Sequence, residues 1–296
     1  VTAAEYFDRQ GEARRVTARI FVVACQAIET ARLLLMSAGP KHPNGLANGT
    51  GQVGRNLLFA GGGAGSGRLS YEKFGDQIRE FGTFVNRALQ DWYVIDDPDF
   101  GPRQKGGTVE FVHVHPAPIA RATTVLRGRE GLVWGSALKR SLEEQFRTGR
   151  GVKIEAFCDW LPHDDCYVTL DRNVKDKWGL PVAHVRVAFH PHNLLIGWFL
   201  ADKGARVLKA MGAEDVVAFA VGSPPTNLQA GGCRFGNDPK TSVLDPDCRA
   251  HEVENVFVTD GGFMPTAGAA PYTFTIYANA LRVADRIAAQ LGRRAA

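Results

Sequence analysis

The last forty residues constrain the fold of this chain more than any other segment. An apolar run at residues 255–259 predicts a buried strand, and the acidic turn Asp260-Gly261-Gly262 follows it directly. Apolar residues then recur at helical spacing, so we expect a helix over residues 273–291 with Thr273 as its N-cap. A strand, an acidic glycine turn and an amphipathic helix in this order predict an α/β unit whose turn faces a ligand.

The turn and the start of the helix carry groups that suit a nucleotide cofactor. Glycines let a pyrophosphate or a sugar chain approach the backbone because no Cβ stands in the way. A carboxylate can accept a hydrogen bond from a cofactor hydroxyl, and a helix start presents unpaired N–H groups and a positive dipole end. An ordinary βα unit with a glycine-rich connection is the alternative. The cofactor-binding residues expected here are Asp260, Gly261, Pro271, Tyr272 and Thr273.

Several segments together resemble a known family. Residues 233–245 (CRFGNDPKTSVLD), the run 256–261 (VFVTDG) and Pro265-Thr266 closely resemble the carboxy-terminal signature of the glucose–methanol–choline (GMC) family of flavin oxidoreductases. Residues 21–34 resemble the late strand and helix that lie beside the adenine in that family, and residues 53–57 resemble the loop that follows. Several separate matches in the family's order make the resemblance specific.

The resemblance implies a function. Members of this family use FAD to oxidise a CH–OH group of a sugar, glycoside or other alcohol, and a hydride passes to flavin N5. By the same resemblance, Ala24 and Cys25 lie beside the cofactor, and the start of the last helix stabilises the negative charge of a reduced flavin. A catalytically silent subunit that serves assembly or binding is the alternative function.

One expected part of the family is absent from the sequence. Family members begin with a strand that leads into a GxGxxG turn, and this turn binds the ADP part of FAD. No segment combines the two, since Gly49-Thr50-Gly51-Gln52-Val53-Gly54 has the glycine spacing but does not follow a predicted strand. The glycine-rich run at 61–67 comes after the late Rossmann-like elements, so we interpret it as a strand or bend with close backbone packing. Residues 1–17 predict a β-hairpin that leads into a strand at 18–24. The chain therefore resembles the carboxy-terminal half of a family member, and we expect an amino-terminal partner chain or missing half.

The second expected absence is catalytic. The family places a His three residues before the glycine run that precedes Cys233, and a His or Asn just before the Pro-Thr that opens the last helix. Spacing puts Leu228 and Pro271 at these positions, and neither side chain can move a proton. An amide can orient a hydroxyl but is a poor base, so a histidine on a polar sheet face, such as His113 or His190, is the better mechanistic candidate. The catalytic residues predicted nearby are Asn227, Tyr272 and His190, with Gln229 close to the first.

The middle of the chain reads mostly as strand, with one apolar and one polar face. That pattern is typical of an open antiparallel sheet with a polar floor for a ligand. The strands are expected at 108–115, 153–160 and 182–190, and helices at 136–147 and 193–211.

The predicted fold is therefore mixed α/β, with two parts. Residues 1–60 and 225–296 form a Rossmann-like portion of an FAD-binding domain. Residues 61–224 form a substrate-binding domain built on a mainly antiparallel sheet. The turn at 171–181 is assigned to this second part.

Composition argues against several other classes. The formal net charge is +4 and the basic residues are scattered, which argues against a nucleic-acid partner. No apolar run approaches the length of a membrane span, so we expect a soluble protein, cytoplasmic or periplasmic. The five cysteines show no CxxC spacing and the histidines have no third ligand at a suitable distance, so no metal site is expected. Free thiols are favoured over pairing of Cys158 with Cys166 or Cys233 with Cys248.

Overall fold

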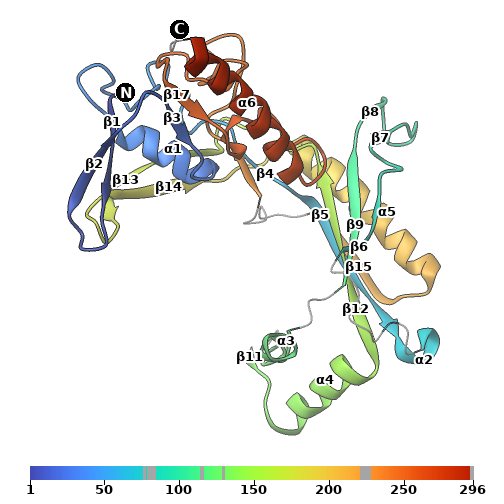
Figure 1. The fold of residues 1–296 in the computed structure, drawn as a ribbon. Helices are drawn as coiled ribbons and strands as arrows, with labels where there is room; N and C mark the ends of the chain where they lie inside the picture. The colour runs from blue at the N-terminus through green and yellow to red at the C-terminus, as the bar shows by residue number, and fades with distance from the viewer. Residues whose placement is uncertain (76–77, 79–84, 114–116, 129–130, 221–227, 294–296) are drawn as a thin grey trace. The chain divides into compact units, whose positions relative to one another are not determined.

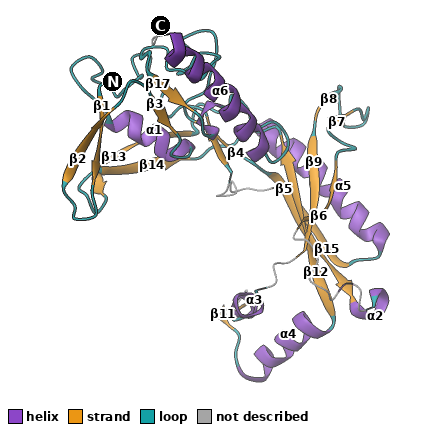
Figure 2. Cartoon of the chain, viewed as in Figure 1, coloured by secondary structure: helices purple, strands orange, loops and turns teal. Residues whose placement is uncertain are grey.

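The structure, a computed structural model, describes residues 1–293 apart from 76–77, 79–84, 114–116, 129–130 and 221–227 (Figure 1). The chain divides into two compact units. The first contains Val1–Ala60, Asp159–Pro191 and Pro224–Ala296, and the second contains Gly61–Cys158 and His192–Ser223. Both units mix helices with mainly antiparallel strands, as the sequence predicts (Figure 2).

The second unit is built on a five-stranded antiparallel sheet with strand order β15-β5-β12-β9-β6. The strands predicted at 108–115 and 153–160 correspond to β9 and β12, which lie side by side in the sheet. The five strands are β5 (Gly62–Ser70), β6 (Val85–Leu89), β9 (Gly107–His113), β12 (Gly149–Cys158) and β15 (Glu214–Ala220).

The two faces of this sheet differ in the way the alternation predicts. Val109, Phe111 and Ile154 lie in the core of the unit together with residues of the long helix α5 (Pro191–Met211). The residues between them, Glu110 and Glu155, are only partly buried and lie opposite each other on β9 and β12. One face therefore packs against α5, and the other carries Glu110 and Glu155 together with the buried Val112 and Phe157.

His113 does not belong to the polar face. It has the same parity as Val109 and Phe111 on β9, and it lines an apolar pocket of about 160 Å³ together with Phe111, Val152 and Leu208. Burial and the nearby Arg150 lower the pKa of His113. The expectation that His113 lies on a polar sheet face is therefore wrong, because side chains alternate strictly along a strand.

The glycine-rich run at 61–67 is a strand with close backbone packing, as interpreted from the sequence. A Cβ on Gly63 would lie 2.0 Å from the carbonyl oxygen of Gly197 in α5, and a Cβ on Gly197 would lie 1.9 Å from the carbonyl oxygen of Gly62. The backbones of α5 and β5 are therefore in direct contact. A side chain at Gly63 or Gly197 would not fit between them. The run contributes to helix–sheet packing and makes no phosphate loop.

The remaining elements of the second unit are short, apart from one amphipathic helix. The helices predicted at 136–147 and 193–211 correspond to α4 and α5. The other elements are α2 (Tyr71–Phe74), β7 (Val94–Ile95), β8 (Gln104–Lys105), α3 (Pro118–Val125), β10 (Arg127–Gly128), β11 (Gly131–Leu132) and α4 (Gly135–Arg147).

The first unit contains a parallel pair of strands, β3 and β17, each followed by a turn. The turn after β3 leads into α1, and the turn after β17 forms a short 3-10 helix, η2. This arrangement matches the Rossmann-like portion that the sequence predicts. The elements of this part are β3 (Phe21–Val23), α1 (Ala27–Met36), β17 (Val256–Val258), η2 (Gly261–Phe263) and α6 (Thr273–Arg293).

Three antiparallel pairs complete the first unit. The predicted hairpin at 1–17 is formed by β1 and β2, and it is confirmed. β4 and β16 also form an antiparallel pair, although they are far apart in the sequence. β13 and β14 are the third pair. The strands are β1 (Ala3–Phe7) with β2 (Ala13–Thr17), β4 (Leu57–Phe59) with β16 (Gln229–Gly231), and β13 (Tyr167–Lys175) with β14 (Pro181–Arg186).

Residues 159–191 pack with the first unit, whereas the sequence assigned them to the second. Arg32 of α1 donates to the carboxylate of Asp176 at 2.7 Å and to the carbonyl oxygen of Pro181 at 2.8 Å. Phe7 of β1 stacks on Trp178 with ring centroids 5.0 Å apart. These contacts hold the turn between β13 and β14 against α1 and β1.

The strand predicted at 182–190 is also shorter than expected. β14 ends at Arg186, pairs with β13 in a two-stranded sheet, and leaves Val185 and Val187 exposed. Its alternation therefore does not reflect burial against a core. His190 lies beyond the strand and not on its polar face.

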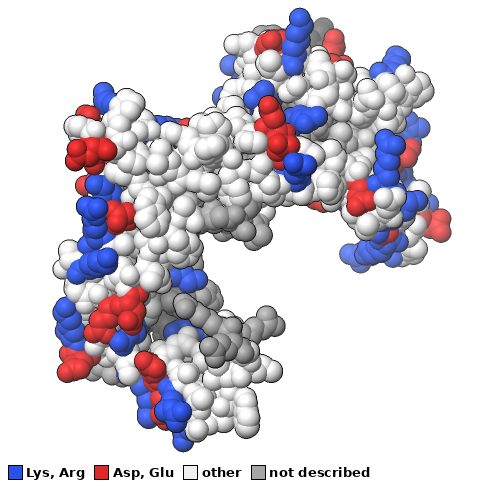
Figure 3. Space-filling view, turned by 180° about the vertical axis from the view of Figure 1, so that it is seen from behind, with Lys and Arg blue, Asp and Glu red and all other residues white. Residues whose placement is uncertain are grey.

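Charge and cysteine state agree with an ordinary protein surface. On the face seen in Figure 3, Lys and Arg side chains are interspersed with Asp and Glu. All five cysteines are free thiols. Within the part of the chain that the structure describes, His, Cys, Asp and Glu side chains form no group of three or more that could hold a metal ion. Among the same residues, none of the helices combines the length and apolar character needed to cross a membrane.

The backbone contact between α5 and β5 predicts a large effect of a single methyl group. Gly197→Ala is expected to lower the free energy of unfolding by about 1–3 kcal/mol, because the new Cβ overlaps the carbonyl group of Gly62. Gly292→Ala is the matched control, since it is also helical and has no atom within 4 Å of its new Cβ. Chemical denaturation would measure both. A Gly197→Ala protein as stable as the Gly292→Ala protein would contradict the close packing.

Candidate active site

Two turns of the first unit are joined through the buried carboxylate of Asp260. The residue follows β17 and is 8% exposed. One carboxylate oxygen accepts from the hydroxyl of Thr30 in α1 at 2.5 Å, and the other accepts from the backbone N–H of Gly262 at 2.7 Å. Backbone N–H groups of Cys25 and Gln26 also stabilise the charged carboxylate. Asp260 therefore ties the turn after β3 to the turn after β17.

The charge state of Asp260 reflects two opposing effects. Burial raises the pKa of Asp260, and the hydrogen bonds from Thr30 and Gly262 lower it in part. The donors around the carboxylate come from the protein itself, so its first role is to organise the two turns. The direct hydrogen bond to a cofactor hydroxyl, expected from the sequence, stays a prediction.

The glycines after Asp260 have a packing role inside the protein. A Cβ on Gly261 would lie 3.0 Å from the carbonyl oxygen of Gln229, and a Cβ on Gly262 would lie 2.8 Å from the carboxylate of Asp260. Glycine therefore lets η2 lie against β16. The sequence alone suggested cofactor approach as the reason for these glycines, and contact of Gly261 with a cofactor stays a prediction.

Tyr272 links the start of α6 to β16. The residue is 2% exposed, and its O–H donates to the backbone carbonyl of Leu228. Burial raises the pKa of Tyr272 above its usual value. A buried phenol that already donates its proton is a poor proton acceptor, which argues against the catalytic role considered for Tyr272. The contact also brings the segment of Leu228 beside the segment of Pro271, the two positions at which the family is expected to carry its catalytic pair.

The other predicted cofactor-binding residues are accessible. Ala24 and Cys25 are exposed at the carboxyl end of β3, and Pro271 and Thr273 are exposed at the start of α6. The carboxyl ends of parallel strands are where open α/β sheets bind their ligands. These four residues therefore stand where a cofactor could reach them.

Gln26 is a site residue that sequence reasoning missed. Its backbone has φ 75° and ψ 147°, and its side chain caps α1 by accepting from the N–H of Ile28 at 3.1 Å. Its amide nitrogen donates to the side-chain oxygen of Gln229 at 2.5 Å. The signal in the sequence is weak, because the residue type gives no hint of a positive φ.

The structure describes His190, one of the predicted catalytic residues. Asn227 lies outside the described residues. His190 is half-buried and follows Phe189, whose ring lies 5.4 Å from that of Trp160. Trp160 in turn lies 6.0 Å from the ring of Phe59. Phe59 of β4 pairs with Gln229, the first residue of β16. The contacts between the rings of Phe189, Trp160 and Phe59 therefore link the segment of His190 to β16.

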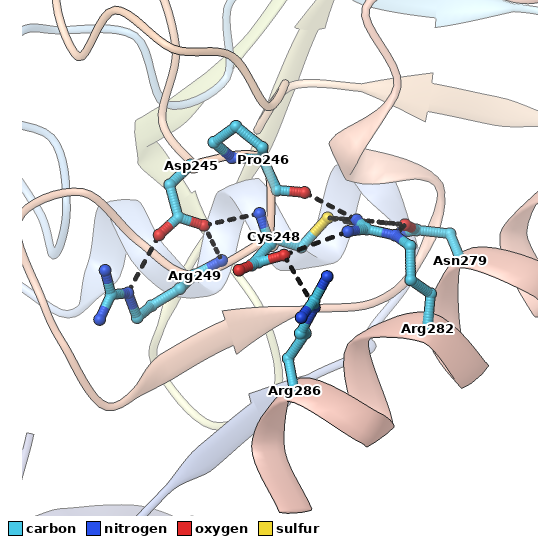
Figure 4. A network of polar contacts seen from close by, with 8 residues as sticks. Asp245, Pro246, Cys248, Arg249, Asn279, Arg282 and Arg286 are labelled. Carbon is cyan, nitrogen blue, oxygen red and sulfur yellow. Dashed lines mark hydrogen bonds and ion pairs between the residues drawn. The ribbon is translucent and has the colours of Figure 1, made fainter. Parts of the chain in front are cut away.

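A network of polar contacts fixes the far part of α6. Arg282 donates to the carbonyl oxygen of Pro246 at 2.7 Å, and its side chain and that of Arg286 both lie 3.3 Å from the carboxylate of Asp247 (Figure 4). Asn279 donates to the thiol of Cys248 at 3.4 Å. Burial raises the pKa of this thiol. The network holds the loop before β17 against α6 and so fixes the direction of the helix.

The Tyr272 contact predicts a pH-dependent stability difference. Since folding raises the pKa of this phenol, its contribution is fully present below pH 10, near the usual tyrosine pKa, and is lost as the pH rises further. Tyr272→Phe is expected to cost about 1 kcal/mol at neutral pH through the lost hydrogen bond, and to lack this steep loss above pH 10. Denaturation curves at several pH values would measure it. Equal slopes above pH 10 in both proteins would contradict the buried contact.

Comparison with known proteins finds relatives along almost the whole chain. Residues 162–280 match the carboxy-terminal family model described as GMC oxidoreductase. The chain is 32% identical over 298 residues to 2-methyl-1,2-propanediol dehydrogenase of Mycolicibacterium austroafricanum, covering 97% of this chain and 51% of that protein. It is 30% identical over 295 residues to the fructose dehydrogenase large subunit of Gluconobacter japonicus, covering 97% of this chain and 50% of that protein.

A solved structure has the same fold. Formate oxidase superimposes with a TM-score of 0.64 at 16% sequence identity, covering 98% of this chain and 57% of that chain. The chain spans about half the length of the curated relatives it matches. The family match and the relatives along the chain show that this chain is similar to the carboxy-terminal half of GMC oxidoreductases.

Proposed function

We propose that the protein uses FAD to oxidise a CH–OH group of a sugar, glycoside or other alcohol. The observation that carries the proposal is the pair of turns after β3 and β17, joined by Asp260, in a chain similar to GMC oxidoreductases. Two relatives support the substrate class, because their names describe dehydrogenases of a diol and of fructose. FAD, when bound, accepts the hydride at N5.

The residues of the first unit fit the flavin end of FAD. The exposed Ala24 and Cys25 lie at the end of β3, and the start of α6 offers unpaired N–H groups and a positive dipole end. We assign Asp260, Gly261 and the backbone around Thr273 to this end of the cofactor. Since Gly49–Gly54, which has the GxGxxG spacing, follows α1 and not a strand, we assign the residues that hold the ADP end to another segment or chain.

We assign the two units to different tasks. The first unit is the FAD-binding portion, and the second is the substrate-binding domain. The polar face of its sheet, with Glu110 and Glu155 opposite each other, suits the hydroxyl groups of a polyol. Burial and the charge of Glu155 raise the pKa of Glu110, so this face disfavours further negative charge.

The proton acceptor comes from outside the two family positions. Leu228 and Pro271 hold no ionisable group, and Tyr272 already donates its proton to a carbonyl oxygen. We propose His190 as the acceptor, because the ring contacts of Phe189 and Trp160 connect its segment to β4 and β16. Asn227 is the alternative as an orienting amide, which would not replace the base.

We further propose that an amino-terminal half, on the same protein or on a partner chain, covers the outer face of α6. Phe274 is 85% exposed, Tyr277 60% and Leu281 72%, and they follow one another at helical spacing. The opposite face of α6 already packs through Val283. A helix that is apolar on both faces is normally buried on both. The relative named as a large subunit supports a partner chain.

The activity is tested by rapid mixing of the flavin-loaded protein with a panel of diols, sugars and glycosides. Flavin bleaching is expected with at least one of them, and His190→Ala is expected to slow bleaching by 10²-fold or more, roughly the contribution of a general base. His184→Ala is the matched control, since His184 lies on β14 of the same unit. Bleaching by no alcohol would favour the catalytically silent subunit, and unchanged bleaching in His190→Ala would exclude His190 as the base.

The covered face of α6 predicts a difference between the 296-residue chain and the complete protein. Leu281→Glu is expected to leave the melting temperature of the 296-residue chain unchanged, because this side chain is exposed there. In the complete protein or assembly it is expected to lower both the melting temperature and the FAD content, since a charge would be buried. Leu132→Glu, at an equally exposed leucine of the second unit, is the control. Full FAD content in the Leu281→Glu assembly would contradict the proposed contact.

A further inference from the structure

Gln26 holds a backbone conformation that only glycine adopts freely. Its φ of 75° and ψ of 147° lie close to a region in which a Cβ clashes with the backbone. Strained residues persist where their surroundings fix them. Here the fixing contacts are the N–H of Ile28, the side chain of Gln229 and the carboxylate of Asp260. These contacts therefore keep the Gln26 amide in one place and one orientation.

The orientation of the Gln229 amide follows from that of Gln26. The N–H of Ile28 is only a donor, so the side-chain oxygen of Gln26 must face it. The nitrogen of the same amide then faces Gln229, whose side-chain oxygen must be the acceptor. The nitrogen of Gln229, with two N–H donors, is consequently turned away from Gln26. The backbone N–H of Ile28 at the start of α1 thus determines the orientation of the Gln229 side-chain amide.

Gln229 occupies a position that matters for the chemistry. It is the first residue of β16 and directly follows Leu228, which stands where the family is expected to carry a proton-moving His. The carbonyl of Leu228 accepts from Tyr272, and the carbonyl of Gln229 lies against Gly261. The Gln229 amide is therefore fixed beside the turn after β17 and the start of α6.

We propose that Gln229 orients the substrate by donating an N–H to the oxygen of the alcohol being oxidised, and that Gln26 is the positioning residue that fixes this donor. The inference rests on the proposed oxidation of a CH–OH group. The side chain of Leu228 offers the substrate oxygen no hydrogen bond, and an adjacent amide supplies one. An amide nitrogen has two N–H donors, so it can serve the substrate in addition to protein acceptors.

The amide takes no part in the bond changes of the reaction. The C–H bond of the alcohol breaks with transfer of a hydride to the flavin, the O–H proton passes to the base, and a C=O bond forms. Gln229 keeps both its hydrogens and donates to the same oxygen in the alcohol and in the carbonyl product. Binding of the product, which has no proton to give, therefore isolates the donor role from the base.

The first test measures binding of the carbonyl product to the flavin-loaded complete protein by equilibrium titration. The wild-type protein is first mixed with the alcohol panel, and the carbonyl product of the alcohol that bleaches the flavin is the probe. Gln229→Ala is expected to weaken binding by roughly three- to tenfold, the usual effect of one hydrogen bond. Gln229→Glu is expected to weaken it further, because an ionised carboxylate has no N–H to donate and also repels the carbonyl oxygen of the product. Gln10→Ala, at an exposed turn residue between β1 and β2, is the control and is expected to bind like wild type.

The second test separates positioning from stability. Gln26→Gly and Gln26→Ala both remove the amide, but only alanine keeps a Cβ in the strained backbone. Both are expected to weaken product binding by the same factor as Gln229→Ala, whereas only Gln26→Ala is expected to lower the melting temperature. The double variant Gln26→Gly with Gln229→Ala is expected to bind no worse than Gln229→Ala alone, because the two residues act through one donor.

Three outcomes would overturn the inference, each in a different way. Wild-type product affinity in Gln229→Ala, at full FAD content, would remove the orienting role. Wild-type affinity in Gln26→Gly would show that Gln229 needs no positioning partner. Flavin bleaching by no alcohol in the wild-type protein would overturn the proposed function, and the inference would fall with it, whatever melting temperatures the Gln26 variants have.

Discussion

The buried carboxylate of Asp260 is the contact on which the rest of the site depends. A charge with little exposure is tolerated only where hydrogen bonds compensate for lost water, and here Thr30 and Gly262 provide them. The same bonds join the turns at the ends of two parallel strands, β3 and β17. Because Gly261 lies against β16 and Tyr272 donates to Leu228, the positions of η2, β16 and α6 follow from this junction.

The two positions at which the resemblance predicts a proton-moving pair lie close together, but neither carries an ionisable side chain. Tyr272 brings the segments of Leu228 and Pro271 together, yet neither residue is ionisable. The arrangement of these segments therefore does not depend on side chains that could transfer a proton. The turns after β3 and β17 depend on hydrogen bonds that Leu228 and Pro271 do not make through their side chains, so the fold places no physical requirement on a histidine at either position.

Local patterns predicted most elements, and long-range contacts account for the errors. β9, β12 and α4 follow from periodicity, and the glycine run at 61–67 is a strand because bare backbone lets α5 approach. Nothing in the alternation at 182–190 shows which core it belongs to. The contact of Arg32 with Asp176 spans 144 residues, and it holds that segment in the first unit. The parity of His113 with Val109 was visible in the sequence and decides its face.

Within the site, residue type predicted less than within the fold. The sequence identified Asp260 and the turn around it but gave no sign of Gln26, because a glutamine with positive φ is defined by its partners and not by its own preference. The residue type of Tyr272 is compatible with an acid or a base. Its burial and the hydrogen bond from its O–H to the carbonyl of Leu228 show that its proton is already donated within the protein. Hydrogen-bond direction, which a sequence does not contain, decides both roles.

Exposed apolar surface gathers on two elements of the first unit, β3 and α6. β3 and β17 form a parallel pair, and parallel strands are normally covered on both faces, yet Val22 of β3 is 51% exposed. α6 begins at the same site and presents Phe274 and Leu281 to solvent on the face opposite Val283. Both exposed surfaces belong to elements that carry the proposed flavin contacts. A segment that buried them would therefore approach the cofactor site from the side of β3 and α6, and the hydrophobic contact that stabilises the assembly would also bring the ADP-binding residues to the flavin end.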